Sequence, residues 1–208
     1  MQLLTTKTSS FPNSQNPLAS SGADGAWIAW GTTNLKATAG SGVNAVSGSF
    51  AAMVWNTSDY TFLADGQTSS ATIGAKGNFD DVGASVLCTG SGATANGYYA
   101  STGFSGNSIF INRVDSGTAT QLTSGSHTWA LNDVLKLSYT LSTHTLAAAV
   151  NGSTIISTTD STYTSGQPGL WYTDGNVNAS FISVFTGTDP FVAATSSGPL
   201  PRQIYVMP

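Results

Sequence analysis

Residues 135–160 constrain the fold more than any other stretch, because they read as three consecutive antiparallel strands. The first of them, over 135–140, alternates apolar and polar residues, which is the period-2 pattern of a half-buried strand. The chain turns back near His144, and Asn151-Gly152 then provides the two positive-φ positions of a type I′ hairpin turn. A meander of this size cannot bury its apolar face alone, so the sequence predicts that the remaining chain supplies the other strands of a β-sandwich.

The acidic residues also favour strands over helices. All ten of them are Asp and none is Glu, and only six Lys and Arg accompany them, so no amphipathic helical pattern of useful length exists. Short, evenly spaced strand patterns with turn signals between them predict an all-β protein, an antiparallel β-sandwich of the jelly-roll type. We expect an extended N-terminal arm over residues 1–20, the jelly-roll domain over 21–189, and a linker with an apolar C-terminal tail over 190–208.

One strand pattern is especially regular. Val82, Ala84, Val86 and Cys88 occupy alternate positions, which predicts that all four share one buried face of a strand. Cys88 is then a small core residue. As the single cysteine of the chain, it cannot form an internal disulfide.

Charge and hydropathy exclude several kinds of partner. The net charge is −4 and the six cationic residues are spread singly, so they form no track for the phosphates of a nucleic acid. No apolar run approaches the ~18 residues that span a membrane. The first residues carry one Lys and no apolar core, so we expect no secretory signal. With the single cysteine, these features predict a chain that is made and kept in a reducing cytoplasm or leaves it by a route other than a signal peptide, as in a virus particle released by lysis. The 8% of charged residues suits a protein inside an assembly or outside a cell.

The sequence predicts no catalytic, metal or cofactor site. Hydrolysis of a glycosidic bond uses two carboxylates that face each other, and Asp80-Asp81 is the single clustered pair, whose side chains point to opposite faces of a strand. His127 and His144 do not share the spacing of metal ligands. His144 falls at a hairpin tip, where a solvated turn residue is expected.

The aromatic residues are the candidates for binding. Sugar rings stack on flat exposed aromatic faces, while Asn and Asp side chains bond to sugar hydroxyls. The alternative is that these rings fill the core or a contact between subunits. The candidate carbohydrate-binding residues are Trp171, Tyr172, Asp174, Asn176, Tyr99 and Trp129.

The end of the chain is a candidate docking segment. Ile204, Tyr205, Val206 and Met207 form a strand-like apolar run that follows Pro199 and Pro201. Such a segment is suited to adding a strand to an exposed sheet edge on another subunit. The alternative is a frayed terminus.

From about residue 11 to 187 the chain resembles the concanavalin A-like lectin/glucanase superfamily, in its laminin-G-like branch. The residues that carry the resemblance are Asp133, Asn151, Gly152, Asp160, Gly166, Pro168 and Gly169, with Asn16-Pro17-Leu18, Trp27 and Gly97-Tyr98-Tyr99 upstream. The resemblance implies a concanavalin A-like jelly roll. Many relatives hold a calcium ion through acidic or amide side chains, but the matching positions here are Ser9 and Ser180, and the Glu pair of the glucanase members is absent.

Sandwiches with short apolar tails are similar to ones found among tailed-bacteriophage virion proteins. The resemblance implies a non-catalytic virion structural protein, exposed on the particle as a capsid decoration or fibre component and binding host surface glycans. Its expected partners are other virion proteins of the capsid or tail, and further copies of itself. The alternative is a free carbohydrate-binding, lectin-like module, and an enzyme is the third reading.

Overall fold

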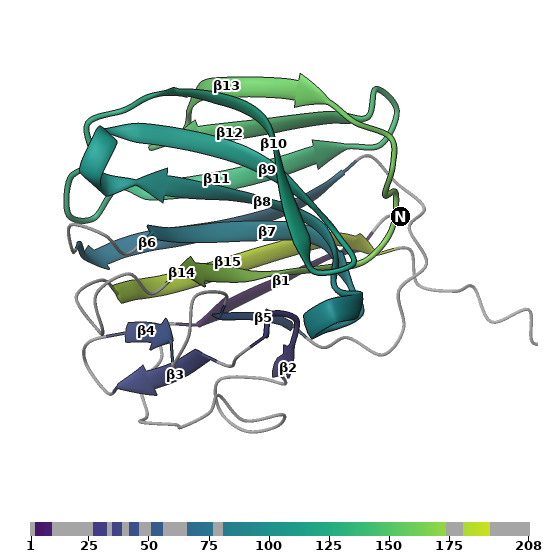
Figure 1. Cartoon of the computed structure of the whole chain (residues 1–208), viewed down its shortest axis with the longest axis horizontal. Helices are drawn as coiled ribbons and strands as arrows, with labels where there is room; N and C mark the ends of the chain where they lie inside the picture. The colour runs from purple at the N-terminus through teal and green to yellow at the C-terminus, as the bar shows by residue number, and fades with distance from the viewer. Residues whose placement is uncertain are drawn as a thin grey trace, which may run out of the picture.

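Antiparallel strands make up nearly all of the described part of the chain (Figure 1). The structure is a computed structural model, and it describes residues 3–9, 27–32, 35–38, 42–45, 51–55, 66–76, 81–173 and 181–191. The strands are β1 (Leu3–Ser9), β2 (Trp27–Ala29), β3 (Leu35–Thr38), β4 (Gly42–Ala45), β5 (Ala51–Trp55), β6 (Gln67–Ala75), β7 (Asp81–Thr89), β8 (Asn96–Gly103), β9 (Ser108–Asp115), β10 (Thr118–Ser126), β11 (Val134–Thr140), β12 (Thr145–Val150), β13 (Ser153–Thr159), β14 (Gln167–Thr173) and β15 (Phe181–Phe191). The described part also contains two single-turn 3-10 helices, η1 (Gly92–Thr94) and η2 (Phe104–Gly106). Neither the helices nor any other described segment forms a helix long and apolar enough to cross a bilayer.

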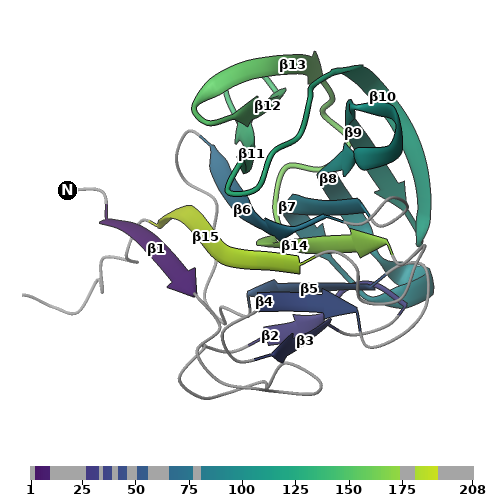
Figure 2. The same ribbon diagram turned by 90° about the vertical axis from the view of Figure 1, so that its left-hand side faces the viewer.

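The strands form two sheets that lie face to face as two layers (Figure 2). The eight-stranded sheet has the order β13-β12-β11-β6-β15-β4-β3, with β1 paired to β15 as its eighth strand. The seven-stranded sheet has the order β10-β9-β8-β7-β14-β5-β2. Every pairing within both sheets is antiparallel. The predicted all-β antiparallel sandwich of the jelly-roll type is therefore confirmed.

The predicted meander is present as β11, β12 and β13, at one edge of the eight-stranded sheet. Asn151 and Gly152 have φ values of +52° and +85°, which are the positive values that a type I′ turn requires. The β9–β10 hairpin turns in the same way through Ser116 and Gly117. Local turn chemistry thus sets the register of both hairpins.

Buried side chains form two clusters on opposite faces of the seven-stranded sheet. The main core lies between the sheets and takes Tyr98, Leu170 and Tyr172 from the seven-stranded sheet. Their chain neighbours Tyr99 and Trp171 belong to a second cluster, so this cluster lies on the outer face, because successive strand residues point to opposite sides. The second cluster comprises Trp30, Ala52, Val54, Cys88, Ala95, Tyr99, Val114 and Trp171.

A bulge in β7 corrects the expectation for Cys88. Leu87 has φ +56° and the β7–β8 register shifts between Val86 and Thr89. Because a bulge inserts one extra residue, Val86 and Leu87 both face the main core and Cys88 moves to the outer face. Cys88 is buried, as predicted, but it does not share a face with Val82, Ala84 and Val86.

Gln67 holds this bulge from the facing sheet. Its side chain is fully buried, its Oε1 accepts a hydrogen bond from the Leu87 N–H (2.7 Å), and its Nε2 donates to the Gly166 carbonyl (3.0 Å). Gly166 itself has φ +143°, and a Cβ there would lie 2.2 Å from the Leu87 carbonyl carbon. Only glycine fits this close approach, so Gln67, Leu87 and Gly166 form one polar clamp inside an apolar core.

The N-terminal arm differs from the expectation. Residues 3–9 form β1, which pairs along its whole length with β15 of the same chain. β15 runs to Phe191, slightly beyond the expected end of the domain at residue 189. The expected apolar tail, with Ile204, Tyr205, Val206 and Met207, lies outside the described residues.

The clamp leads to a stability prediction. We expect Gln67→Leu to lower the free energy of unfolding by about 3 kcal/mol, because it leaves the buried Leu87 N–H and the partly buried Gly166 carbonyl without their side-chain partner. Urea unfolding measures the loss. Gln121→Leu, the same change on the exposed face of β10, is the matched control and should shift the midpoint little. If the two substitutions lowered the free energy of unfolding equally, the stabilising role of the clamp would be wrong.

Candidate functional site

Two of the predicted sugar-stacking residues stack on each other. The rings of Tyr99 and Trp171 lie 4.2 Å apart with an interplanar angle of 10°. Both belong to the cluster on the outer face of the seven-stranded sheet, and they are 6% and 7% exposed. Most of each ring face is therefore occupied by protein atoms and is not open to a sugar ring.

The other predicted rings lie deeper. Tyr172 and Trp129 are 0% and 2% exposed within the main core, and the Trp129 indole donates to the Ser108 carbonyl (2.8 Å). A ring buried on both faces cannot stack on a sugar, so the expectation of exposed stacking faces is corrected for these two residues: they pack the core. Asp174 and Asn176, the polar candidates, lie outside the described residues.

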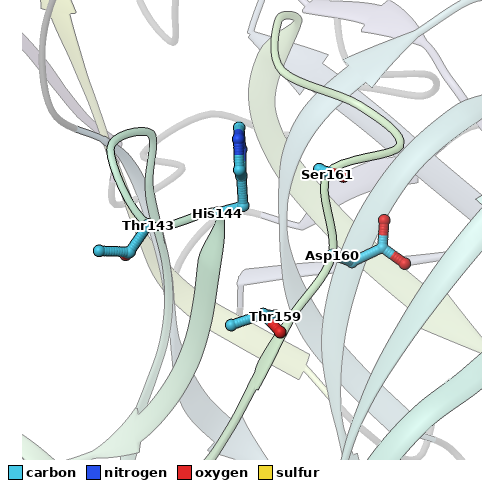
Figure 3. A pocket seen from close by; sticks show the side chains of 5 residues that line it. All are labelled: Thr143, His144, Thr159, Asp160 and Ser161. Atoms are coloured by element: carbon cyan, nitrogen blue, oxygen red, sulfur yellow. The ribbon is translucent and has the colours of Figure 1, made fainter.

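A hollow of about 300 Å³ opens at the end of the sandwich, between the β11–β12 turn and the segment that follows β13 (Figure 3). We call it the His144 pocket. Its lining consists of Thr143, His144, Thr159, Asp160 and Ser161. Thr143, Thr159 and Ser161 are exposed, and the Thr143 hydroxyl lies 2.8 Å from the hydroxyl of Thr145.

His144 is fixed in place and is not a freely solvated turn residue. It adopts φ +52° at the tip of the hairpin, and its carbonyl accepts a hydrogen bond from the Asp160 N–H (3.0 Å). Its ring Nδ1 lies 2.8 Å from the Tyr139 hydroxyl. Burial raises the pKa of Tyr139, so the phenol keeps its proton. The tautomer of His144 decides which of the two groups donates in this bond: Nε2–H is a donor when Nδ1 accepts from the phenol, and Nε2 is an acceptor when Nδ1–H donates to it.

Asp160 carries the charge of the pocket lining, and its carboxylate is fully engaged. Oδ1 accepts from the Tyr98 hydroxyl (2.7 Å) and the Thr162 N–H (2.8 Å), and Oδ2 accepts from Arg113 Nη1 (2.8 Å). Burial alone would raise the Asp160 pKa, but these hydrogen bonds outweigh it and lower the pKa to about 2. In Figure 3 the carboxylate points away from the His144 ring.

The same contacts join the two sheets. Asp160 follows a strand of the eight-stranded sheet, whereas Tyr98 and Arg113 belong to β8 and β9 of the seven-stranded sheet. Arg113 Nε also pairs with Asp115 Oδ2 (2.8 Å), and the Tyr163 hydroxyl donates to Asp115 Oδ1 (2.7 Å). We call these five residues the Asp160 network. It holds one wall of the pocket against the opposite sheet.

The other histidine, His127, lies outside the pocket and is paired with a carboxylate. Asp133 Oδ2 accepts from the Ala130 N–H (2.8 Å) and lies 3.1 Å from His127 Nε2, while Oδ1 accepts from the Asn151 side chain (2.8 Å). These contacts tie the loop before β11 to the β12–β13 turn. Within the described ranges, no three His, Cys, Asp or Glu side chains are grouped so as to hold a metal ion.

The pocket is equipped for hydrogen bonding to neutral polar molecules. It presents hydroxyl groups that both donate and accept, together with an imidazole whose orientation is fixed by Tyr139. The sequence singled out Asp160 through the family resemblance and His144 through its place at a hairpin tip. Thr143, Thr159 and Ser161 carry no signal of their own, because Ser and Thr are common throughout this chain.

Several solved structures share the fold. Carbohydrate-binding module CBM66 from Bacillus subtilis is 15% identical, with a TM-score of 0.55 over 78% of this chain and 91% of that chain. The apo Crh5 transglycosylase is 11% identical (TM-score 0.51; 88% and 84%). The exoplasmic/lumenal domain of VIP36, in a Ca2+/Man3GlcNAc-bound form, is 12% identical (TM-score 0.51; 82% and 86%). The sequence matches no protein-family model and no curated protein. The likeness shows a concanavalin A-like lectin/glucanase fold.

The lowered Asp160 pKa leads to a pH prediction. Because the folded-state pKa of about 2 lies below the ordinary value of 3.8, Asp160 stabilises the fold above pH 4, and this stabilisation is lost as the pH falls toward 2. The Asp160 side chain is only 10% exposed, and we expect its contribution to be about 2 kcal/mol.

Urea unfolding of Asp160→Asn against the unchanged protein tests this. The stability difference should be present at pH 7 and should shrink between pH 4 and pH 2. Thr159→Val, on the exposed neighbouring residue, is the control and should leave the pH profile unchanged. A difference that stays constant down to pH 2 would show that the carboxylate charge is not involved.

Proposed function

We propose that this protein binds glycans without chemical conversion, and that the His144 pocket is the binding site. The observation that carries the proposal is the lining of the pocket: three exposed Ser and Thr residues and an imidazole bonded to Tyr139, around an opening of about 300 Å³ on a concanavalin A-like sandwich. This volume is at the lower end for ligand pockets, so it suits the terminal unit of a glycan better than a long stretch of chain.

The recognition chemistry follows from the groups present. Sugar hydroxyls donate and accept hydrogen bonds, and so do the hydroxyls of Thr143, Thr159 and Ser161. The Nε2 atom of His144 bonds to a sugar hydroxyl, as donor or acceptor according to the tautomer, while Tyr139 holds the ring from Nδ1. The Asp160 N–H bond to the His144 carbonyl joins the two walls of the pocket, and the Asp160 network holds one of them against the opposite sheet, which lowers the ordering cost of binding.

The state of Asp160 supports a non-catalytic role. A general acid for glycoside cleavage needs a raised pKa so that it holds a proton near neutral pH. Asp160 has the opposite property, with a pKa of about 2 and both carboxylate oxygens in hydrogen bonds. The chain also has no Glu that could act beside it.

As to biological context, we propose that the protein is made in a host cytoplasm and carried on a bacteriophage particle, as a capsid decoration or fibre component that contacts other virion proteins. The support is compositional: charged residues make up only 8% of the chain. Apart from Ala119, the exposed positions of β10 and β13 carry Ser, Thr and Gln. A neutral polar surface of this kind suits a subunit held within an assembly.

The binding site is tested by substitution. On an array of bacterial surface glycans, followed by calorimetric titration of the strongest binder, we expect His144→Ala to weaken binding roughly two- to tenfold, the value of one lost hydrogen bond. His127→Ala, the same change at the other histidine, is the matched control and should bind as the unchanged protein does. Equal binding by both variants, or no glycan bound at all, would contradict the proposed site.

The virion context is tested separately. Quantitative mass spectrometry of purified particles from the source should find this chain in a fixed ratio to the major capsid protein. A ratio near one or a simple fraction of it indicates a capsid decoration, and a few copies per particle indicate a tail or fibre. Absence from the particles would overturn the virion context and leave a free carbohydrate-binding module.

A further inference from the structure

The edge strands of the two sheets differ in how well they are protected against pairing with strands of other chains. β10 and β13, the edges on one side, lie so close that a Cβ on Gly125 would come within 2.5 Å of the Ile156 side chain. β2 and β3, on the other side, are only three and four residues long. Short edge strands and edges covered by other elements are the usual protection against unwanted pairing. β1 is seven residues long, and no strand among the described residues covers its free side.

β1 is a seven-residue strand that is held by one neighbour. Its register with β15 is unbroken from Leu3 opposite Phe191 to Ser9 opposite Phe185. Figure 2 shows β1 at the margin of the eight-stranded sheet, beside β15. Among the strands that the structure describes, none pairs with its other side. The backbone N–H and C=O groups of that side can therefore accept a further strand.

We propose that β1 is the acceptor for residues 203–207 of a second copy of this chain, which pair with it as an added antiparallel strand. This segment, Gln-Ile-Tyr-Val-Met, combines β-branched and aromatic residues, which favour strands, and has no charge. The single charged residue of β1 is Lys7, so the pairing brings no like charges together. The proposal concerns self-association and does not depend on glycan binding.

The direction of the chain favours a second copy over the chain's own tail. β15 ends at Phe191, opposite the first residue of β1. A tail that turned back once from there would run antiparallel to β15, and so parallel to β1, which is the slightly less stable pairing. To pair antiparallel with its own β1, the tail would first have to run back along β1, about 23 Å, and this would take up most of residues 192–202. A tail from another copy can approach in the antiparallel direction without that return. Pro199 and Pro201 also favour an extended chain just before the segment.

The reach of the tail permits this exchange. Eleven residues, 192–202, separate Phe191 from Gln203. An extended chain of that length spans about 35 Å, enough to leave one sandwich and reach the edge of another. If two copies each place their tail on the β1 of the other, they form a closed dimer. If each copy instead places its tail on the next copy, the copies form a ring or a filament.

The proposal is tested by disulfide trapping between two differently tagged copies of the full chain. One copy carries Val206→Cys, and the other carries Thr5→Cys or Thr6→Cys, two adjacent strand positions that face opposite sides. Native Cys88 is buried, and burial raises the pKa of its thiol, so it does not compete. We expect a mixed disulfide with one of the two β1 variants. Thr120→Cys, on the exposed opposite edge, is the matched control and should give none.

Two outcomes would overturn the proposal. In the first, a chain carrying both substitutions forms only an internal disulfide, which means that the tail pairs with its own β1. In the second, no disulfide forms with either β1 variant, and deletion of residues 203–208 leaves the mass in solution unchanged. The proposal requires that this deletion reduce the assembly to the 21.2 kDa monomer. Glycan binding by the His144 pocket should survive the deletion.

Discussion

The carboxylate of Asp160 is the contact on which the end of the sandwich depends. It lies just after β13 of one sheet and accepts hydrogen bonds from Tyr98 and Arg113 of the other. An ionised group in a partly buried place is tolerated only when it is paired and hydrogen-bonded, and here each oxygen has at least one donor. One wall of the His144 pocket is consequently fixed against the opposite sheet, and the Asp160 N–H bond to the His144 carbonyl joins it to the other wall. A pocket of hydroxyls at the mobile end of a hairpin would otherwise lose affinity to the cost of ordering.

A second cross-sheet contact acts at the bulge of β7. Gln67 satisfies the Leu87 N–H and the Gly166 carbonyl, two backbone groups that the sheets leave without partners. Burying an amide side chain in an apolar core is unfavourable unless both of its ends are bonded, and in this case they are. The bulge turns Cys88 toward the outer face, where Tyr99 and Trp171 stack. The outer face of the seven-stranded sheet is therefore a second packed layer, and its aromatic residues contribute to stability.

Much of the fold could be predicted from the sequence, because its signals are local. The Asn151-Gly152 turn and the alternation in β11 depend on residues close together in the chain, and both are present as expected. β1 was missed because its pairing with β15 depends on residues about 180 positions apart. The bulge at Leu87 leaves no mark in the sequence, since a positive φ is unusual for leucine and is imposed by contacts with the other sheet.

The functional site was harder to predict for the same reason. Periodicity says which face of a strand a ring occupies, but it does not say what covers that face, so Tyr172 and Trp129 looked like binding residues while they fill the core. The His144 pocket combines a hairpin tip with a segment one strand further on, and its hydroxyl groups belong to the commonest residue types of the chain. Only their arrangement in space distinguishes them.

The most direct measurement of the central claim is an NMR titration of the isotope-labelled protein with a glycan that it binds. We predict that the backbone signals of Thr143, His144 and residues 159–161 move together and saturate, while those of the outer face of the seven-stranded sheet stay in place. Shifts confined to the neighbourhood of Tyr99 and Trp171 would contradict the claim. They would place the glycan on the aromatic face and leave the His144 pocket without a role in binding.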